Sequence, residues 1–239
     1  MMSNNKQQKL PFSVSLVVPV YNNEQTVIKQ LDMIHKILNS LCSDYEILIG
    51  DDYSSDKTVK LIKDRYAENN KFKINVNTQN LGIAKNLKHL YKNASKEYVA
   101  LFSADGDWDP NDIKRLLIKA LETKADLVIG ERNKKKQYNA YRRTISYLYN
   151  FLPKILFSVE TFDAGSIKVI KRDYLQDAKF LSKGVFFEAE LIIRTKKNGG
   201  KITNCPINFK RKNDKDTGAK LKLVFESLVD IAILKLNGL

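Results

Sequence analysis

The sequence predicts an α/β fold, a mostly parallel β-sheet with helices on both faces that is followed by a C-terminal amphipathic helix. Two observations lead to this prediction. From residue 13 to about residue 130, short apolar runs alternate with segments whose apolar residues recur at helical spacing. The chain of 239 residues, 43% of them hydrophobic, is also long enough to bury one sizeable core. We therefore expect a flexible N-terminus over 1–12, one main domain over 13–218 and a terminal helix over 219–239.

The first half of the chain supplies five predicted strands, each a short apolar run: Val14–Val18, Tyr45–Ile49, Phe72–Val76, Glu97–Phe102 and Asp126–Ile129. A helix is expected after each of the first four. These helices run from Asn22 or Asn23 through Leu38, from Ser55 or Asp56 through Tyr66, over Ile83–Tyr91 and over Asp112–Glu122. Parallel strands end at one edge of a sheet, where ligands bind. The polar residues that follow the strands should meet there: Tyr21, Asp52, Asp105 with Asp107, and Arg132.

The segment Phe102–Pro110 places three carboxylates where the fourth strand ends. Asp105 and Asp107, two residues apart on a turn, can share one hard divalent cation, and this cation can hold a diphosphate. Asp52 can accept a hydrogen bond from the ring N–H of uracil or guanine. The alternatives are structural: Asp109 as a helix cap with the other two carboxylates solvated, and Asp52 in an Asx-turn.

The charge of the chain limits its partners. A formal net charge of +14 favours a polyanionic partner, which means nucleic acid, an anionic membrane face or a phosphate-bearing substrate. Nucleic-acid binding requires aromatic residues interleaved with basic ones on one face. Tyr138, Tyr141, Tyr147 and Tyr149 meet this requirement only in part, so we expect no nucleic-acid partner.

Several signals are missing from the sequence. No glycine-rich phosphate loop follows the first strand, which disfavours phosphate binding by such a loop and disfavours a nucleotidyltransferase. Cys42 and Cys205 match no metal spacing and are expected to be reduced thiols. No run approaches the roughly 18 apolar residues of a membrane-spanning helix, and Met1–Pro11 is polar. We therefore expect a cytoplasmic protein.

The second half of the chain is more basic. Asn133–Tyr138 is expected to loop over the site, and a helical apolar stripe follows from Tyr141 to Leu156. Arg142 and Arg143 stand near the start of this stripe. They are either the solvated end of a core helix or a bidentate site for the phosphate of an acceptor.

Four further elements are expected after this helix: a strand at Ala164–Ile170, a helix at Gly184–Lys197, an edge strand at Ile202–Phe209 and an apolar helix from Leu221 to Leu234. The last helix could pack on the domain, form a dimer contact or lie in a membrane interface. Glu188 and Glu190 are candidates for a general base. Glu190 equally fits a carboxylate favoured by the helix dipole.

Four segments follow one another in a characteristic order: Pro19–Glu24, Asp51–Thr58, Asn80–Gly82 and Ala104–Pro110. Together they resemble the signature of the family 2 inverting glycosyltransferases, which have the GT-A fold, a Rossmann-like nucleotide-binding sheet. Three stretches look closest to the polyprenol-phosphate mannose and glucose synthases, the dolichyl-phosphate mannose synthase-like members: Ala104–Pro110, Arg142–Ser146 and Asp163–Ser166. The resemblance covers roughly Val14 to Lys220.

The resemblance implies roles for individual residues. Those matching the nucleotide-contacting positions of the family are Pro19, Tyr21, Asn23, Asp52 and Ala104. Asp105 ends the family's Asp-x-Asp motif and Asp107 falls on a further ligand position, which implies Mg²⁺ or Mn²⁺ at these two. Ser103 stands where the first aspartate of the motif is expected. One carboxylate is therefore missing, and a non-catalytic nucleotide-sugar-binding relative stays an alternative.

The resemblance also implies that the donor diphosphate contacts Arg132, Arg211 and Lys220. The last two lie in Lys210–Lys220, which resembles the loop that closes over the donor in the polyprenol-phosphate synthases. A solvated run of charge is the other interpretation of this segment.

The resemblance implies a metal-dependent inverting transfer of a hexose from a GDP- or UDP-linked sugar. The expected acceptor is a polyprenyl phosphate of the undecaprenyl or dolichyl type, and the enzyme would lie peripherally at the inner face of the membrane in cell-envelope glycan synthesis. An ionised phosphate needs no base, which agrees with the missing base aspartate of the family. The alternative acceptor is a hydroxyl of a polysaccharide or glycolipid, with Glu188 or Glu190 as the base.

Overall fold

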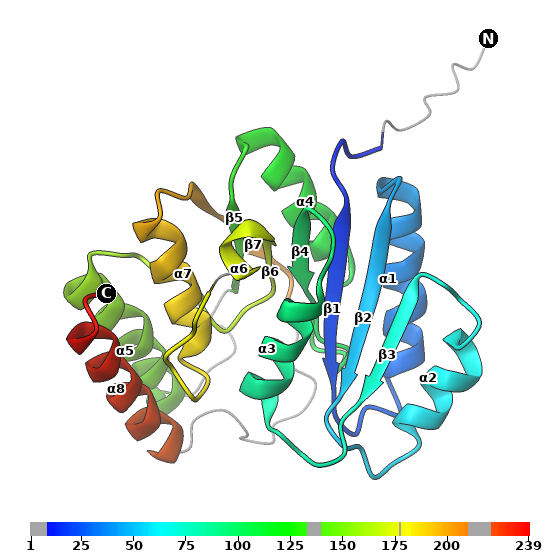
Figure 1. Ribbon diagram of the computed structural model, residues 1–239, viewed down its shortest axis with the longest axis horizontal. Coiled ribbons are helices and arrows are strands. Elements are labelled where there is room, and N and C mark those ends of the chain that lie inside the picture. The colour runs from blue at the N-terminus through cyan, green and yellow to red at the C-terminus, as the bar shows by residue number, and fades with distance from the viewer. Residues whose placement is uncertain (1–8, 133–139, 177, 210–220) are drawn as a thin grey trace.

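The computed structural model describes residues 9–132, 140–176, 178–209 and 221–239 and contains one seven-stranded sheet in the order β3-β2-β1-β4-β6-β5-β7 (Figure 1). The strands are β1 (Val14–Val20), β2 (Tyr45–Asp51), β3 (Phe72–Val76), β4 (Tyr98–Leu101), β5 (Leu127–Arg132), β6 (Lys168–Lys171) and β7 (Ile202–Ile207). The pairs β3-β2, β2-β1, β1-β4 and β5-β7 are parallel. The sequence prediction of a mostly parallel sheet is confirmed.

Strand β6 is antiparallel to both of its neighbours, β4 and β5. It begins at Lys168, four residues later than the strand expected from Ala164, because the Asp163–Ser166 stretch forms a turn in which the N–H of Ser166 donates to the carbonyl of Asp163 at 2.9 Å. The predicted edge strand is found as β7, at the outer position beside β5.

Eight helices are described: α1 (Val27–Leu41), α2 (Thr58–Tyr66), α3 (Ile83–Asn93), α4 (Asn111–Thr123), α5 (Ala140–Phe157), α6 (Asp173–Gln176), α7 (Phe187–Lys197) and α8 (Leu221–Leu236). The short α6 was not expected from the sequence. Helices α1, α2 and α4 contribute to one buried cluster, and α3, α5, α6, α7 and α8 contribute to the other. These clusters lie on opposite faces of the sheet, as the sequence predicts (Figure 1).

Helix α1 begins one turn later than expected. Asn22 has a positive φ of 50°, which is incompatible with a helical start, and the N–H groups of Thr26 and Val27 both donate to the carbonyl of Asn23. The expected cap of α2 is found at Asp56, whose carboxylate accepts from the N–H of Thr58 at 2.9 Å. Asp109 caps α4 in the same way, through the N–H of Asn111 at 2.9 Å.

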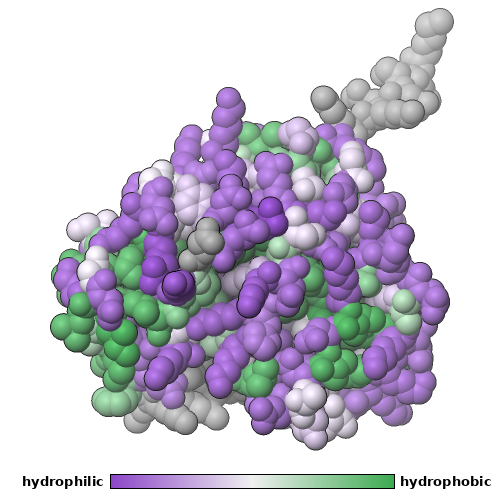
Figure 2. All heavy atoms as spheres, viewed as in Figure 1, coloured by the Kyte–Doolittle hydropathy of each residue, from purple (hydrophilic) through white to green (hydrophobic). Residues whose placement is uncertain are grey.

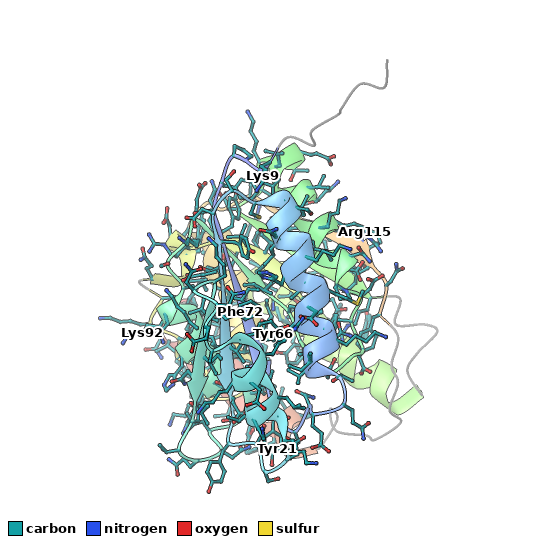
Figure 3. All side chains as sticks on the ribbon, turned by 90° about the vertical axis from the view of Figure 1, so that its right-hand side faces the viewer. Lys9, Tyr21, Tyr66, Phe72, Lys92 and Arg115 are labelled. Atoms are coloured by element: carbon teal, nitrogen blue, oxygen red, sulfur yellow. The ribbon has the colours of Figure 1, made fainter. Side chains whose placement is uncertain are left out.

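A buried glutamate ties the first strands together. Glu46 on β2 accepts from the hydroxyl of Ser15 on β1 at 2.6 Å and from the N–H of Ser95 at 2.8 Å, and it pairs with Lys73 on β3 at 2.6 Å. Burial by itself raises the pKa of Glu46, but these partners outweigh burial and lower the pKa to about 2. On the other face of the sheet, the rings of Tyr66 and Phe72 stack with their centroids 4.0 Å apart between α2 and β3. Figure 3 labels the two residues near each other.

Helices α5 and α8 lie side by side at the far end of the molecule from β3 (Figure 1). Asp230 fixes α8 to the body, because its buried carboxylate accepts from the N–H groups of Lys183 and Gly184 at 3.0 and 3.2 Å. The opposite side of α8 is exposed and apolar at Phe225, Leu228 and Val229. Figure 2 shows hydrophobic side chains gathered over this helix. No helix within the described ranges has the length and apolar character needed to cross a membrane.

Candidate functional site

A cavity of about 340 Å³ opens at the carboxyl ends of β1 and β2, between the start of α3 and the turn after β4. Its walls are built from four segments, whose lining residues are Pro19, Val20, Tyr21, Asn23, Asp52, Asn80, Gly82, Ile83, Asn86, Ser103 and Asp105. Five residues predicted from the sequence therefore line one cavity: Pro19, Tyr21, Asn23, Asp52 and Asp105. Figure 3 shows Tyr21 at the end of the molecule opposite Lys9, the end at which the first strands finish.

Asp52 organises the floor of the cavity. Its two carboxylate oxygens accept from the N–H groups of Leu81 and Gly82 at 2.8 and 2.9 Å, and one of them also accepts from the amide of Asn77 at 3.1 Å. Asp52 is 5% exposed. The carboxylate predicted to contact a nucleobase therefore also holds the 80–82 loop in place, and the oxygen that accepts from Gly82 keeps a second lone-pair direction for a further donor.

Two loops are bonded to each other at the rim. The N–H of Asn22 donates to the hydroxyl of Ser54 at 2.9 Å, and the side-chain oxygen of Asn22 accepts from the N–H of Ser55 at 2.9 Å. Asn23 stabilises the same turn, since its side-chain oxygen accepts from the N–H of Tyr21 at 3.1 Å. The loop after β1 and the loop after β2 thus form one rigid rim.

The acidic turn brings the two predicted metal ligands together. The N–H of Asp107 donates to the carboxylate of Asp105 at 3.0 Å. Burial raises the pKa of Asp105, and the charge of Asp107 raises it further, against hydrogen bonds from the Asp107 N–H, from Ser103 and from Trp108 that lower it. Ser103, which stands in place of the expected first aspartate, therefore contacts Asp105 instead of adding a carboxylate.

The chemistry of this turn fits a divalent cation. Two adjacent carboxylates of which one is largely buried repel each other, and a hard cation with oxygen ligands relieves that repulsion. Within the described part of the chain, no group of three or more His, Cys, Asp or Glu side chains converges as a metal site. A cation here would therefore take its remaining ligands from water and substrate oxygens.

Ala104 is fully buried and does not line the cavity. Its carbonyl accepts from the hydroxyl of Thr26 at 2.7 Å, which ties the acidic turn to the start of α1. The predicted nucleotide contact at Ala104 is therefore placed behind the cavity wall, where it fixes the position of Asp105.

Arg132 is held by Asp163 in a bidentate pair. Its Nε and one terminal nitrogen donate to the two carboxylate oxygens at 2.8 and 2.7 Å. The guanidinium also lies 5.3 Å from the ring centre of Trp108 and 5.1 Å from that of Phe209. Arg132 is not among the residues that line the cavity. It lies beside the acidic turn, however, because Trp108 is part of that turn.

The two candidate bases are both enclosed. Glu188 on α7 pairs with Lys168 on β6, which is fully buried, and accepts from the hydroxyl of Tyr91 at 3.3 Å. Glu190 is 0% exposed and accepts from the N–H groups of Leu181 and Ser182 at 2.9 and 2.8 Å, with Arg194 at 2.7 Å. Neither lines the cavity. Through these contacts, both carboxylates hold α7 against the segments around it.

The remaining predicted residues are not placed at the cavity by the structure. Arg142 and Arg143 lie on α5, but their side chains are outside the described part. Arg211 and Lys220 fall within 210–220, which is also outside the described residues.

Sequence reasoning missed several cavity residues. Asn86 on α3 donates to the carbonyl of Gly50 at 2.8 Å, and a Cβ at Gly50 would meet the Asn86 oxygen at 2.6 Å. Asn80 donates to the carbonyl of Asp52 at 3.1 Å. The signal for this side of the cavity was the Asn80–Gly82 segment and Gly50 near the end of β2, which permits the close approach of α3.

Comparison with known proteins agrees with this architecture. Residues 15–178 match the family profile of Glycosyl transferase family 2. An uncharacterised protein of Methanocaldococcus jannaschii is 30% identical over 205 residues, which cover 78% of this chain and 83% of that protein. Undecaprenyl-phosphate 4-deoxy-4-formamido-L-arabinose transferase of Aeromonas hydrophila is 29% identical over 176 residues, which cover 73% of this chain and 52% of that protein.

Solved structures share the fold at low sequence identity. Mannosyl-3-phosphoglycerate synthase of Rubrobacter xylanophilus has a TM-score of 0.71 at 17% identity, covering 95% of this chain and 75% of that one. Glucosyl-3-phosphoglycerate synthase of Mycobacterium tuberculosis, in complex with Mn²⁺, UDP and glucosyl-3-phosphoglycerate, has a TM-score of 0.68 at 18% identity, covering 95% and 81%. Both differ from the polyprenol-phosphate synthases that the sequence motifs resemble.

Proposed function

Because this chain belongs to glycosyl transferase family 2 and is a glycosyltransferase of the GT-A fold that takes a sugar from a nucleotide sugar, we propose that it transfers a hexose, with inversion, to a polyprenyl phosphate at a membrane surface. The observation that carries the donor half of this proposal is the cavity in which Asp52, Tyr21 and Asp105 meet. The nucleobase lies against the loops after β1 and β2, and the diphosphate lies toward the acidic turn.

Each residue around the cavity has a separate task in this proposal. Asp52 accepts a hydrogen bond from the base and keeps the 80–82 loop in place. Asp105 and Asp107 would hold Mg²⁺ or Mn²⁺, which when bound supplies Lewis-acid neutralisation of the departing diphosphate. Arg132, oriented by Asp163, adds fixed positive charge beside the acidic turn. The M. tuberculosis relative, with Mn²⁺ and UDP in its structure, supports this cofactor class.

A phosphate acceptor is favoured by the state of the two glutamates. A hydroxyl must lose a proton as it attacks, and this requires a base within hydrogen-bond reach, whereas a phosphate is already ionised. Glu188 and Glu190 are engaged in buried contacts away from the cavity. The Aeromonas relative, an undecaprenyl-phosphate transferase, supports a lipid-linked phosphate as the acceptor.

The apolar outer side of α8 supports a membrane location for the reaction. Phe225, Leu228 and Leu236 are 69%, 47% and 86% exposed, although the inner side of the same helix is docked through Asp230. Ile155 on the adjacent α5 is 60% exposed. Apolar side chains on a helix of a strongly basic protein suit the interface of an anionic bilayer. Arg142 and Arg143 on α5 would receive the acceptor phosphate, and Arg211 and Lys220 would contact the donor diphosphate.

The proposal is tested by a transfer assay with purified protein. UDP- and GDP-linked hexoses are each incubated with Mn²⁺ and a short-chain polyprenyl phosphate, and the lipid product is separated and identified by mass. We expect one donor to give a polyprenyl-phosphate hexose. We expect no product when Mn²⁺ is omitted and a chelator is added. Transfer to a glycan hydroxyl or to phosphoglycerate, with none to the lipid phosphate, would overturn the proposed acceptor. Absence of nucleotide binding would overturn the donor site.

A further inference from the structure

We infer that Tyr53 is a nucleobase contact that stacks against the base from the opposite loop to Tyr21, at the cost of local backbone strain. The inference rests on the proposed nucleotide-sugar site and adds a residue that neither the motifs nor the lining of the cavity identified.

The backbone of Tyr53 is in an unfavourable conformation. Its φ is 68°, in the left-handed region, where a bulky side chain is a genuine outlier and where glycine or asparagine is the usual residue. Such strain persists only where neighbouring contacts hold it, and it is commonly found at ligand sites. An aromatic residue at this position therefore requires a reason beyond the turn itself.

The contacts around Tyr53 hold the strained turn in place. On its C-terminal side, the carboxylate of Asp51 accepts from the N–H of Ser54 at 2.9 Å, and Ser54 also accepts from the N–H of Asn22. On its N-terminal side, Asp52 is fixed by the 80–82 loop. Both neighbours of Tyr53 are thus anchored to the walls of the cavity, and Tyr53 is the residue between the anchors.

The same contacts bring Tyr53 and Tyr21 to one rim. Tyr21 precedes Asn22 and Tyr53 precedes Ser54, and Asn22 and Ser54 are hydrogen-bonded to each other at 2.9 Å. The two tyrosines are 50% and 57% exposed, and neither belongs to the buried clusters of the described chain. The rings therefore contribute little to folding, although the loops that carry them are rigid.

The chemistry that suits two exposed aromatic rings beside a carboxylate is a nucleobase. Every base has a π-face that can stack on an aromatic side chain, and stacking is tolerant of which base is present. Asp52, adjacent to Tyr53, offers an acceptor for a ring N–H at the edge of the base. In this arrangement Tyr53 contributes affinity, and the choice between uracil and guanine is left to the polar groups.

Four variants and two probes test the inference. Tyr53→Asn and Tyr53→Gly remove the ring and suit a positive φ, and Tyr53→Phe keeps the ring. Lys124→Gly is the matched control, because Lys124 has a φ of 52° at the end of α4, far from the cavity lining. Binding is measured by calorimetry with the nucleoside diphosphate that the wild type prefers, and with inorganic pyrophosphate, each in Mn²⁺. The thermal midpoint is measured without ligand.

We expect Tyr53→Asn and Tyr53→Gly to raise Kd for the nucleotide at least about fivefold, leaving Kd for pyrophosphate unchanged, because stacking acts on the base alone. The thermal midpoint of both should be equal to or above that of the wild type. Tyr53→Phe should bind the nucleotide as the wild type does. Lys124→Gly should raise the thermal midpoint without changing Kd for the nucleotide.

Unchanged nucleotide affinity in Tyr53→Asn would overturn the inference while leaving the donor site intact. An equal loss for nucleotide and pyrophosphate would also overturn it, since the effect would then come from a displaced loop. If the wild type itself binds no nucleoside diphosphate, the failure belongs to the proposed function instead.

Discussion

The donor end and the helical end of this protein present opposite kinds of surface, one polar and one apolar. At the donor end, around the cavity after β1 and β2, polar groups are fixed by hydrogen bonds: Asp52 lines the cavity and accepts from the 80–82 loop, and Asn22 is bonded to Ser54 at the rim. At the helical end, α8 uses its polar residue Asp230 to dock inward and presents apolar side chains outward. A preorganised polar rim suits a small charged ligand, whereas an unpaired apolar surface suits a large apolar one. The two ends therefore agree with the proposal of a nucleotide-sugar donor and a lipid-linked acceptor.

The largest effect is expected at the acidic turn. Asp105→Ala should abolish the Mn²⁺-dependent stabilisation by nucleotide and lower kcat about 100- to 1000-fold, because the charge developing on the diphosphate loses its counter-ion. Thermal shift with and without Mn²⁺, and steady-state transfer, measure the two effects.

Asp109→Asn is the matched control for this variant, since Asp109 lies in the same turn but caps α4, a role that asparagine keeps. Nucleotide stabilisation that survives in Asp105→Ala and still depends on Mn²⁺ would remove Asp105 as a ligand.

The next effect lies between the two ends, at the buried pair of Lys168 and Glu188. Lys168→Met should lower the free energy of unfolding by about 3–5 kcal/mol, because it leaves Glu188 charged and without its cation in the interior. Adding Glu188→Gln should recover part of this loss. Denaturant unfolding of the single and double variants measures it.

Variants of the same pair also distinguish a phosphate acceptor from a hydroxyl acceptor. If Glu188 were a catalytic base for a hydroxyl, the double variant would regain stability but not activity. Recovery of transfer to polyprenyl phosphate together with stability is the result that agrees with a structural role.

Near the amino ends of the first strands, at the sheet edge opposite the cavity, Glu46 predicts a pH dependence of stability. Its pKa is lowered in the folded protein to about 2 from an ordinary 4.5, so its stabilisation is complete above about pH 4.5 and is lost as the pH falls toward 2. A shift of this size corresponds to roughly 3 kcal/mol. Glu46→Gln should lower the thermal midpoint near neutral pH and flatten its decline in acid. An acid transition of Glu46→Gln as steep as that of the wild type would contradict the assignment.

The smallest effect is expected at the helical end. Replacing both Phe225 and Leu228 with serine should weaken binding to vesicles that contain anionic lipid by about tenfold, because two exposed apolar side chains leave the interface. The thermal midpoint and the affinity for nucleotide should not change. Sedimentation with vesicles measures the first quantity, and vesicle binding equal to that of the wild type would contradict a membrane role for α8.

The donor end was more predictable than the helical end for a physical reason. In a parallel sheet, the position of a polar residue after a strand decides which edge it reaches, so Tyr21, Asp52 and Asp105 could be brought together from spacing alone. Spacing does not reveal what a carboxylate contacts. The bonds from Leu81 and Gly82 to Asp52 depend on how a loop 30 residues away folds back.

Strand direction and buried charge were not predictable either. The apolar pattern of β6 is the same whether it runs parallel or antiparallel, and nothing in the local sequence indicates that Lys168 is buried against a glutamate 20 residues later. Asn22 and Tyr53, with their positive φ, could not be recognised because neither is glycine.

The central claim is that a divalent cation at the acidic turn holds the diphosphate of a nucleotide whose base lies in the cavity. A crystal structure with bound nucleoside diphosphate and Mn²⁺, using the anomalous signal of manganese, tests it most directly. We predict one manganese peak between the carboxylates of Asp105 and Asp107 and the diphosphate, with the base beside Asp52. A manganese peak elsewhere, or a nucleotide bound while both carboxylates turn away from it, would contradict the account.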